Sequence, residues 1–271
     1  MTATTTLTHH PSPKQQEQTV PMTPDQATTF LDSLESGELR AATRDTDGTW
    51  QVDAAVKEGI LAVFRLSDVV ELPGWPGGAV DKELVPAREI TPADGVRFVP
   101  GGSSVRRGAA LRPGVVVMPP SYVNVGAYVG EDSMVDSHVL VGSCAQVGAR
   151  VHLSAAVQLG GVLEPIGARP VVVEDDAFVG AQCGLFEGVV VRSRAVLAPG
   201  TILTSRTVIY DLVHGREVRG EVPEGAVVVP GSRPAGGAYG QGLGLSLYAP
   251  VIVKYRDGST DASTVLEEAL R

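Results

Sequence analysis

Residues 122–160 read YVNVGAYVGEDSMVDSHVLVGSCAQVGARVHLSAAVQLG, and in this stretch an aliphatic residue returns at every sixth position. The spacing extends upstream to Val105 and, after the interruption GGVLEPIGARPVV, resumes on a new register from Val173 to Ile209. The complete set has 17 members: Val105, Leu111, Val117, Val123, Val129, Val135, Val141, Val147, Leu153, Leu159, Val173, Val179, Leu185, Val191, Leu197, Leu203 and Ile209.

A repeat of six residues is too short for a helical solenoid. It predicts a mainly β protein, a parallel β-helix of triangular cross-section with one short strand on each face. Small or β-branched side chains mostly follow four residues after each aliphatic one, as at Ala127 and Val139, which suits tight inward packing. Three hexads a turn give about five to six coils, a prism about 27 Å long at a strand spacing of about 4.8 Å. The alternative is a β-sandwich with chance periodicity.

The sequence on either side of the repeat has a different character. Thr23, Pro24 and Gln26 form a helix start with a capping box, and residues 52–66 carry apolar side chains at helical spacing. We therefore predict a disordered tail over 1–22, a small mainly helical N-terminal domain over 23–100 and the β-helix over 101–234. A short C-terminal extension over 235–271 should contain a strand in SLYAPVIVKY and a closing helix in TVLEEALR.

Composition limits the classes of function. A formal charge of −9 argues against general binding of nucleic acid, because such affinity comes mainly from Lys and Arg. The chain has only two cysteines, Cys144 and Cys183, which lie in no metal-ligand spacing, so we expect no bound metal. The absence of a long apolar run or a targeting segment predicts a cytoplasmic protein that does not span a membrane.

Several segments resemble the tetrahydrodipicolinate N-succinyltransferases of bacterial lysine biosynthesis. They are MPPSYVNVGAYV, MVDSHVLVGSCAQVGARVHLS, GGVLEP, VVVEDDAFVGA and SLYAPVIVKY, and the similarity runs from about residue 28 to 258. The resemblance implies a left-handed coil and a homotrimer with active sites between subunits. It also implies succinyl-CoA as the acyl donor, and tetrahydrodipicolinate, opened to 2-amino-6-oxopimelate, as the acceptor.

The resemblance also implies roles for individual residues. Acyl transfer to an amine needs a deprotonated nitrogen and donors for the oxyanion, and Asp136 matches the acidic residue that the family uses for the acceptor amine. An aspartate in a coil can instead satisfy turn amides. Arg97 matches an arginine that holds a substrate carboxylate, although it could be a surface residue. His152 and His138 are expected to contact substrate, without a catalytic role for His152.

The donor site should lie near the C-terminal coils, where basic side chains can meet the phosphates of coenzyme A. Lys254, Arg206 and Arg194 are the candidates, and Lys254 is the best match to the family. Most basic residues of this region should be solvated surface charges.

Departures from the family gather around the expected pocket. Gly184 stands where the family has a glutamate that is a proposed partner of the aspartate, which leaves Glu187 as the second catalytic candidate. Gln182 replaces an arginine, and Ala155, Ala156 and Gln158 replace glycines. A paralogue that acylates a different amino acid and a non-catalytic trimeric scaffold are therefore alternatives. A zinc enzyme of the carbonic anhydrase type is disfavoured, because two of the five histidines, His9 and His10, lie in the tail.

Overall fold

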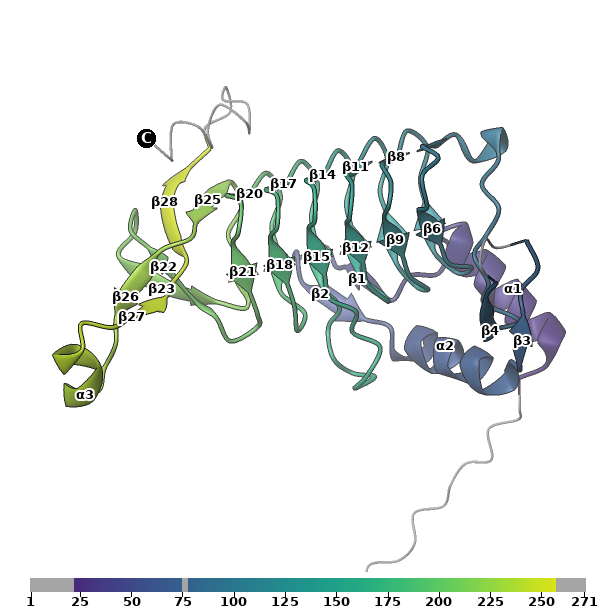
Figure 1. The fold of residues 1–271 in the computed structure, drawn as a ribbon, viewed down its shortest axis with the longest axis horizontal. Helices are drawn as coiled ribbons and strands as arrows, with labels where there is room; N and C mark the ends of the chain where they lie inside the picture. The colour runs from purple at the N-terminus through teal and green to yellow at the C-terminus, as the bar shows by residue number, and fades with distance from the viewer. Residues whose placement is uncertain (1–21, 75–77, 257–271) are drawn as a thin grey trace, which may run out of the picture.

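The structure is a computed structural model that describes residues 22–74 and 78–256. Its main body is a left-handed parallel β-helix whose two-residue strands stack into three flat faces (Figure 1). The predicted fold class is confirmed. The predicted tail over 1–22, apart from Met22, and the closing helix of TVLEEALR lie outside the described residues.

The chain visits the three faces in a fixed order. Face 1 contains β5 (Arg97–Phe98), β8 (Val116–Val117), β11 (Met134–Val135), β14 (His152–Leu153), β17 (Phe178–Val179), β20 (Val196–Leu197) and β25 (Ala226–Val229). Face 2 contains β6 (Ser104–Val105), β9 (Tyr122–Val123), β12 (Leu140–Val141), β15 (Gln158–Leu159), β18 (Gly184–Leu185) and β21 (Ile202–Leu203). Face 3 contains β7 (Ala110–Leu111), β10 (Tyr128–Val129), β13 (Gln146–Val147), β16 (Val172–Val173), β19 (Val190–Val191) and β24 (Glu221–Val222).

The aliphatic residues of the repeat form the core of the prism. All 17 are buried, and the most accessible of them, Leu111, is only 6% exposed. Each occupies the second position of its strand, so its side chain points inward while the preceding residue points outward. Ile209 is the exception in position: it lies in the longer strand β22 (Val208–Asp211), which belongs to a hairpin and not to a coil.

Tight turns join the faces, and the third residue after each aliphatic position commonly adopts a left-handed backbone. Glycine accepts this conformation freely, as at Gly126 and Gly200, but His138, Ala156 and Gln182 also adopt it, with φ of 60–63°. His138 and Gln182 therefore project from corners of the prism, where their side chains are exposed.

Two insertions interrupt the coils, and both leave at the edge between face 2 and face 3. In a regular coil Tyr128 pairs with Gln146, 18 residues later. The loop between β15 and β16 lengthens one coil, so that Gln146 pairs with Val172. The hairpin of β22 and β23 (Arg216–Arg219) lies between β21 and β24 and lengthens another, so that Val190 pairs with Glu221.

The N-terminal region contains two helices and two hairpins, and one of these hairpins reaches along the prism as far as Glu174. α1 (Pro24–Glu35) begins with the predicted capping box, in which the Thr23 amide donates to Gln26 Oε1 over 2.9 Å. α2 (Ala54–Leu66) begins later than predicted, because Val52 ends strand β2 and Asp53 caps the helix. The region is less helical than expected, since β1 (Ala42–Arg44) pairs with β2 (Trp50–Val52), and β3 (Val69–Glu71) with β4 (Val80–Lys82).

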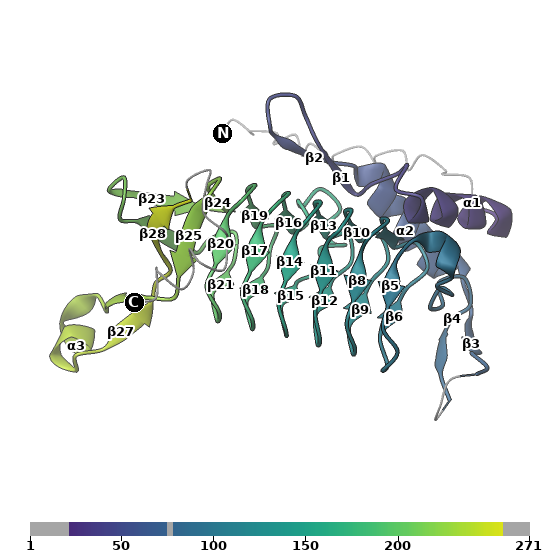
Figure 2. The same cartoon turned by 90° about the horizontal axis from the view of Figure 1, so that it is seen from above.

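The C-terminal region covers the other end of the prism and carries an arm that projects from it (Figures 1 and 2). The predicted strand in SLYAPVIVKY is broken into β27 (Ser246–Tyr248) and β28 (Val251–Tyr255), and β28 pairs with β25. The arm consists of β26 (Ser232–Pro234), α3 (Gly237–Gly242) and β27. Its large apolar side chains are exposed, namely Tyr239, Leu243, Leu245, Leu247 and Tyr248.

Candidate functional site

Face 1 brings three of the predicted site residues to one surface. Strand register aligns Arg97 with Val116, and Met134 with His152, so these residues stand in one outward-facing row. Asp136 follows β11 by one residue and, by strand alternation, projects outward beside this row at the edge between faces 1 and 2. Arg97 is exposed on the first coil, three strands from His152 and therefore about 14 Å away.

The carboxylate of Asp136 is held but not enclosed. Its Oδ1 accepts a hydrogen bond from the Ser137 amide over 2.7 Å, and this is its single hydrogen bond to the described residues. The backbone around it is fixed, because the Asp136 amide donates to Leu153 O over 3.0 Å and Ser121 Oγ donates to Asp136 O over 2.7 Å. A rigid backbone with an available carboxylate oxygen suits a group that must orient a ligand.

His152 packs its ring onto Phe178, with the ring centroids 5.0 Å apart and the planes inclined by 18°. Burial lowers the pKa of His152, and the nearby carboxylate of Asp136 opposes that shift. The imidazole is therefore neutral at neutral pH, and its surroundings are aromatic. His138 lies on the same edge as Asp136 and is exposed, while its carbonyl accepts a hydrogen bond from Gln158 Nε2 over 3.0 Å.

Glu187 does not join Asp136 within one chain. It lies on the edge between faces 2 and 3, is exposed, and accepts a hydrogen bond from Ser205 Oγ over 3.0 Å. Asp136 lies on the edge between faces 1 and 2, two coils nearer to the N-terminus. The two candidate catalytic carboxylates thus occupy different corners of the prism.

We predicted no role for Phe186 from the sequence, although its ring limits which residue can occupy position 184. Its ring lies over two glycines of face 2: a Cβ atom placed on Gly184 would lie 2.6 Å from Phe186 Cε2, and one on Gly160 would lie 2.7 Å from Cδ1. The residue at 184 must therefore be glycine as long as this ring stays in place. The signal available in the sequence was an aromatic residue two positions after an unusual strand glycine.

The three basic candidates for the coenzyme A phosphates are divided between two edges. Arg194 lies in the turn between β19 and β20, and its carbonyl accepts a hydrogen bond from Arg256 Nη1 over 3.2 Å. Lys254 lies on β28 opposite Val227 of face 1. Arg206 is exposed in the turn that follows β21, at the edge between faces 2 and 3.

A cluster around Asp211 was also missed. This buried carboxylate accepts hydrogen bonds from His214 Nδ1 and Tyr255 Oη, each over 2.8 Å, and from Arg216 Nε over 3.1 Å. Burial opposes the charged form, but these hydrogen bonds outweigh it and lower the pKa of Asp211. The cluster ties the hairpin tip to β28, so we assign it a structural role.

The described residues offer no obvious metal centre or membrane segment. Across 22–74 and 78–256, no three His, Cys, Asp or Glu side chains are grouped so that they could hold a metal ion. No described helix has both the length and the apolar character that crossing a bilayer requires. Burial raises the pKa of the thiols of Cys144 to about 12 and of Cys183 to about 11, so both are protonated and poor ligands.

Comparison with known proteins agrees with this architecture. Residues 10–66 match the family model of the tetrahydrodipicolinate N-succinyltransferase N-terminal region, and residues 170–205 match the hexapeptide repeat of succinyl-transferase. Three relatives are named 2,3,4,5-tetrahydropyridine-2,6-dicarboxylate N-succinyltransferase. Those of Nitrobacter winogradskyi, Nitrobacter hamburgensis and Bradyrhizobium diazoefficiens are 44%, 47% and 46% identical over 245 residues, which is 89% of this chain and 87% of each relative. The chain therefore belongs to the tetrahydrodipicolinate N-succinyltransferase family of hexapeptide-repeat acyltransferases.

Proposed function

We propose that this protein transfers the succinyl group of succinyl-CoA to the amine of tetrahydrodipicolinate, in its opened 2-amino-6-oxopimelate form, in the biosynthesis of diaminopimelate and lysine. The observation that carries the proposal is the identity of 44–47% to enzymes of that name over 89% of the chain. Face 1 supports it, because an available carboxylate, an aromatic-flanked histidine and an arginine lie on one surface.

Asp136 is proposed to act on the acceptor amine. An amine is protonated at neutral pH and must lose a proton before it attacks. The Asp136 carboxylate would orient the ammonium and accept its proton; the nitrogen then attacks the thioester carbonyl. The C–N bond forms, the C–S bond breaks, and coenzyme A leaves as the thiol. Arg97 would hold an acceptor carboxylate with its planar fork, and His152 and His138 would contact the acceptor.

Coenzyme A is the proposed partner of the basic side chains near the C-terminal coils. Arg194 and Lys254 both lie toward face 1 at this end, so they are the better pair for the phosphates, and Arg206 would serve on the other edge. Phosphates favour such cations through charge-assisted hydrogen bonds. Backbone amides in the turns beside these residues would donate hydrogen bonds to the pantetheine arm.

A homotrimer is proposed as the active form. One argument is the separation of Asp136 and Glu187 on different edges of one prism, because a neighbouring copy could bring its own edge to complete the site. A second argument is the exposed apolar arm, since soluble monomers seldom expose a contiguous apolar patch of this kind. Light scattering should give three copies per particle.

One observation favours an acceptor other than tetrahydrodipicolinate. Phe186 covers Gly184 where the family carries a glutamate, so this part of face 2 is apolar and not acidic. An acceptor with a smaller or less charged distal end would tolerate that surface. The chain would then be a paralogue that acylates another amino acid.

The test is the release of free coenzyme A thiol from succinyl-CoA, measured with tetrahydrodipicolinate, without acceptor and with a panel of other amino acids. Turnover that requires tetrahydrodipicolinate supports the proposal. Turnover with a different amine alone would replace it by the paralogue. If no acceptor gave turnover with either succinyl-CoA or acetyl-CoA, the protein would be a trimeric scaffold without catalysis.

A further inference from the structure

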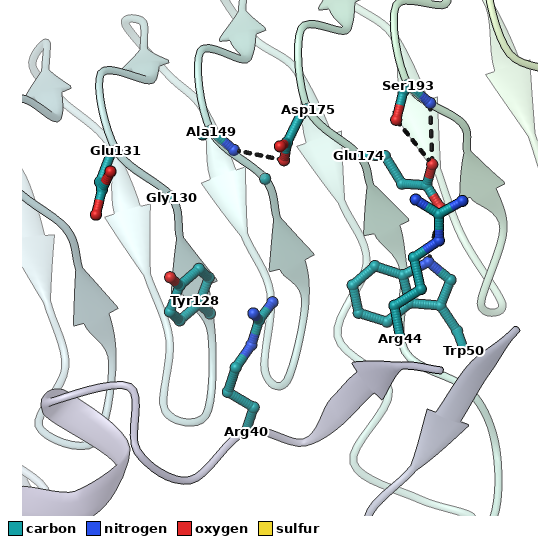
Figure 3. A pocket seen from close by; sticks show the side chains of 11 residues that line it. Arg40, Arg44, Trp50, Tyr128, Gly130, Glu131, Ala149, Glu174, Asp175 and Ser193 are labelled. Atoms are coloured by element: carbon teal, nitrogen blue, oxygen red, sulfur yellow. Dashed lines mark hydrogen bonds and ion pairs between the residues drawn. The ribbon is translucent and has the colours of Figure 1, made fainter. Parts of the chain in front are cut away.

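A separate cavity lies at the edge between face 3 and face 1, away from Asp136 and Glu187. The hairpin of β1 and β2 lies along this edge and encloses a volume of about 360 Å³ against the turns that leave β10, β13, β16 and β19 (Figures 2 and 3). Trp50 and Arg44 enter from the hairpin and Arg40 from the segment before it, while Tyr128 and Glu131 come from the prism. This volume suits a ligand the size of an amino acid.

One wall of the cavity is already fully committed to the fold. Glu174 is 4% exposed and accepts hydrogen bonds from Trp50 Nε1 over 2.9 Å, from Arg192 Nη1 over 3.0 Å, and from both the amide and the Oγ of Ser193 over 3.0 Å. Arg44 completes this group with a 3.5 Å ion pair to the same carboxylate. Glu174 therefore anchors the hairpin and has no capacity left for a ligand.

The opposite wall has charges that the fold leaves available. Arg40 stacks its guanidinium 3.8 Å from the centre of the Tyr128 ring and uses Nε to reach Gln146 Oε1 over 2.9 Å, which leaves both Nη groups without a described acceptor. Glu131 is exposed, and its carboxylate makes no hydrogen bond or ion pair within residues 22–74 and 78–256. Figure 3 shows both at the end of the cavity that also contains Tyr128.

Asp175, which lies between Ala149 and Glu174 in Figure 3, adds a second carboxylate to the cavity. Its Oδ1 accepts a hydrogen bond from the Ala149 amide over 2.9 Å, and its Oδ2 forms a long ion pair of 3.8 Å with Arg150. Arg150 binds both oxygens of Asp176 more closely, over 2.7 Å and 2.9 Å, so Asp175 keeps capacity for a ligand. The available charges are thus one guanidinium and two carboxylates. Their sum is −1, so the complementary ligand has one carboxylate and two ammonium groups.

We infer that this cavity binds a diamino monocarboxylic acid, with its carboxylate on Arg40 and its ammonium groups toward Glu131 and Asp175. A planar guanidinium fixed on an aromatic ring presents two parallel N–H donors, the geometry that recognises a carboxylate. Trp50 and Tyr128 both line the cavity. Because Arg40 already covers one face of Tyr128, the Trp50 ring is the one that can cover the methylene chain and an ammonium group. The site is independent of the acyl-transfer reaction proposed above.

The experiment is calorimetric titration of the full chain with L-lysine, and with two analogues that each lack one charge. Cadaverine lacks the carboxylate and L-norleucine lacks the side-chain ammonium, so each should bind at least about tenfold more weakly than L-lysine. Undetectable binding of L-lysine to the wild-type chain at millimolar concentration would overturn the inference. So would equal binding of L-lysine and either analogue.

Two variants locate the site, and a third is their control. Arg40→Gln and Glu131→Gln should each weaken L-lysine binding by about tenfold or more, because each removes one charged partner. Glu131 has no described partner, so its variant should fold normally even if Arg40→Gln does not. Glu224→Gln changes an exposed carboxylate at the far end of the prism and should leave binding unchanged. Full affinity in Glu131→Gln would show that L-lysine binds elsewhere and would overturn the assignment.

Discussion

Asp136 and Glu174 occupy the same position in the hexad and have opposite surroundings. Each directly follows the aliphatic residue of its strand, Val135 and Val173 respectively. Asp136 is half-buried, and its carboxylate accepts a single hydrogen bond from the part of the chain that the structure describes. Glu174 is buried under the N-terminal hairpin with Trp50, Arg192 and Ser193 around it. The repeat thus supplies equivalent carboxylates, and the non-repeated chain that covers one of them decides which is free for a ligand.

The largest effect expected from this difference concerns activity at Asp136. Asp136→Asn should lower turnover by a factor of about 10² to 10⁴, because it removes the proposed proton acceptor while keeping the shape of the side chain. The free energy of unfolding should hardly change. Thiol release and a denaturant titration measure the two quantities.

Asp132→Asn is the matched control, because Asp132 is an exposed aspartate in the turn before the same coil. It should leave turnover intact. If Asp136→Asn kept wild-type turnover, the free carboxylate would not be the catalytic one, and the contrast with Glu174 would lose its functional meaning.

The reverse pattern is expected at Glu174. Glu174→Gln should lower the free energy of unfolding by about 2 kcal/mol, because the NH2 group of the new amide must face donors, either the Ser193 N–H or Trp50 Nε1 and Arg192 Nη1. Burial raises the pKa of Glu174, but hydrogen bonds from Trp50, Arg192 and Ser193 outweigh it and the net shift is downward. The stabilisation is therefore present above a pH of about 4.5 and is lost as the pH falls.

Denaturant titrations at neutral and acidic pH measure this contribution. Glu131 lies on the same edge, and its carboxylate has no partner among the described residues. Glu131→Gln should therefore change the free energy of unfolding by less than about 0.5 kcal/mol. Equal losses in the two variants would mean that the hairpin does not depend on Glu174.

On face 2 a single side chain, Phe186, covers a strand position, Gly184, as the N-terminal hairpin covers Glu174. Gly184→Ala should lower the free energy of unfolding by about 1 to 3 kcal/mol, because the added Cβ meets the ring of Phe186. The double variant Gly184→Ala with Phe186→Leu should lose less than the sum of the two single losses. Strict additivity in thermal or denaturant unfolding would show that the ring does not restrict residue 184.

The smallest expected effect is a pH dependence at His152. Burial lowers the pKa of this histidine in the folded protein, with Asp136 opposing, so folding favours the neutral ring. The resulting stability is present above the ordinary histidine pKa of about 6.5 and is lost as the pH falls through the lower folded value. The melting temperature of His152→Gln should depend less on pH between about 5 and 7 than that of the wild type. Identical slopes would contradict this account of the Phe178 stack.

The regular part of the fold could be predicted because the evidence for it is local. A buried aliphatic residue every six positions fixes strand, turn and face together, so the periodicity located every coil strand from β6 to β21. Ile209 continued the spacing by chance into a hairpin, and no local signal separates it from the preceding hexads. The break at Pro250 had a local signal, because proline cannot donate a hydrogen bond to the ladder. The strand that ends at Val52 depends on pairing with β1, which the local sequence does not specify.

The placement of the candidate residues could be predicted where it follows from the repeat, and not where distant segments meet. Met134 pairs with His152, 18 residues later, so the repeat itself places Asp136 close to His152. Arg97 precedes the regular coils and pairs with Val116, 19 residues later, so the repeat did not predict its place on face 1. Glu174 and Trp50 are 124 residues apart, so only the folded chain shows that they hold each other. The covering of Gly184 by Phe186 is a matter of side-chain direction. In the proposed trimer, the relation of Glu187 to Asp136 would depend on how neighbouring copies pack, which a single sequence does not specify.

The two insertions at the edge between faces 2 and 3 have a consequence for how such a protein can be altered. The chain leaves the prism after β15 and again after β21, and on each return its next strand pairs in register with the strand one coil below. That corner accepts extra chain of quite different lengths without changing the pitch of the stack. An affinity tag, a reporter peptide or a small folded domain is therefore best grafted into the loop between β15 and β16, and not after β21, where Arg206 lies. The other two corners should tolerate only substitutions.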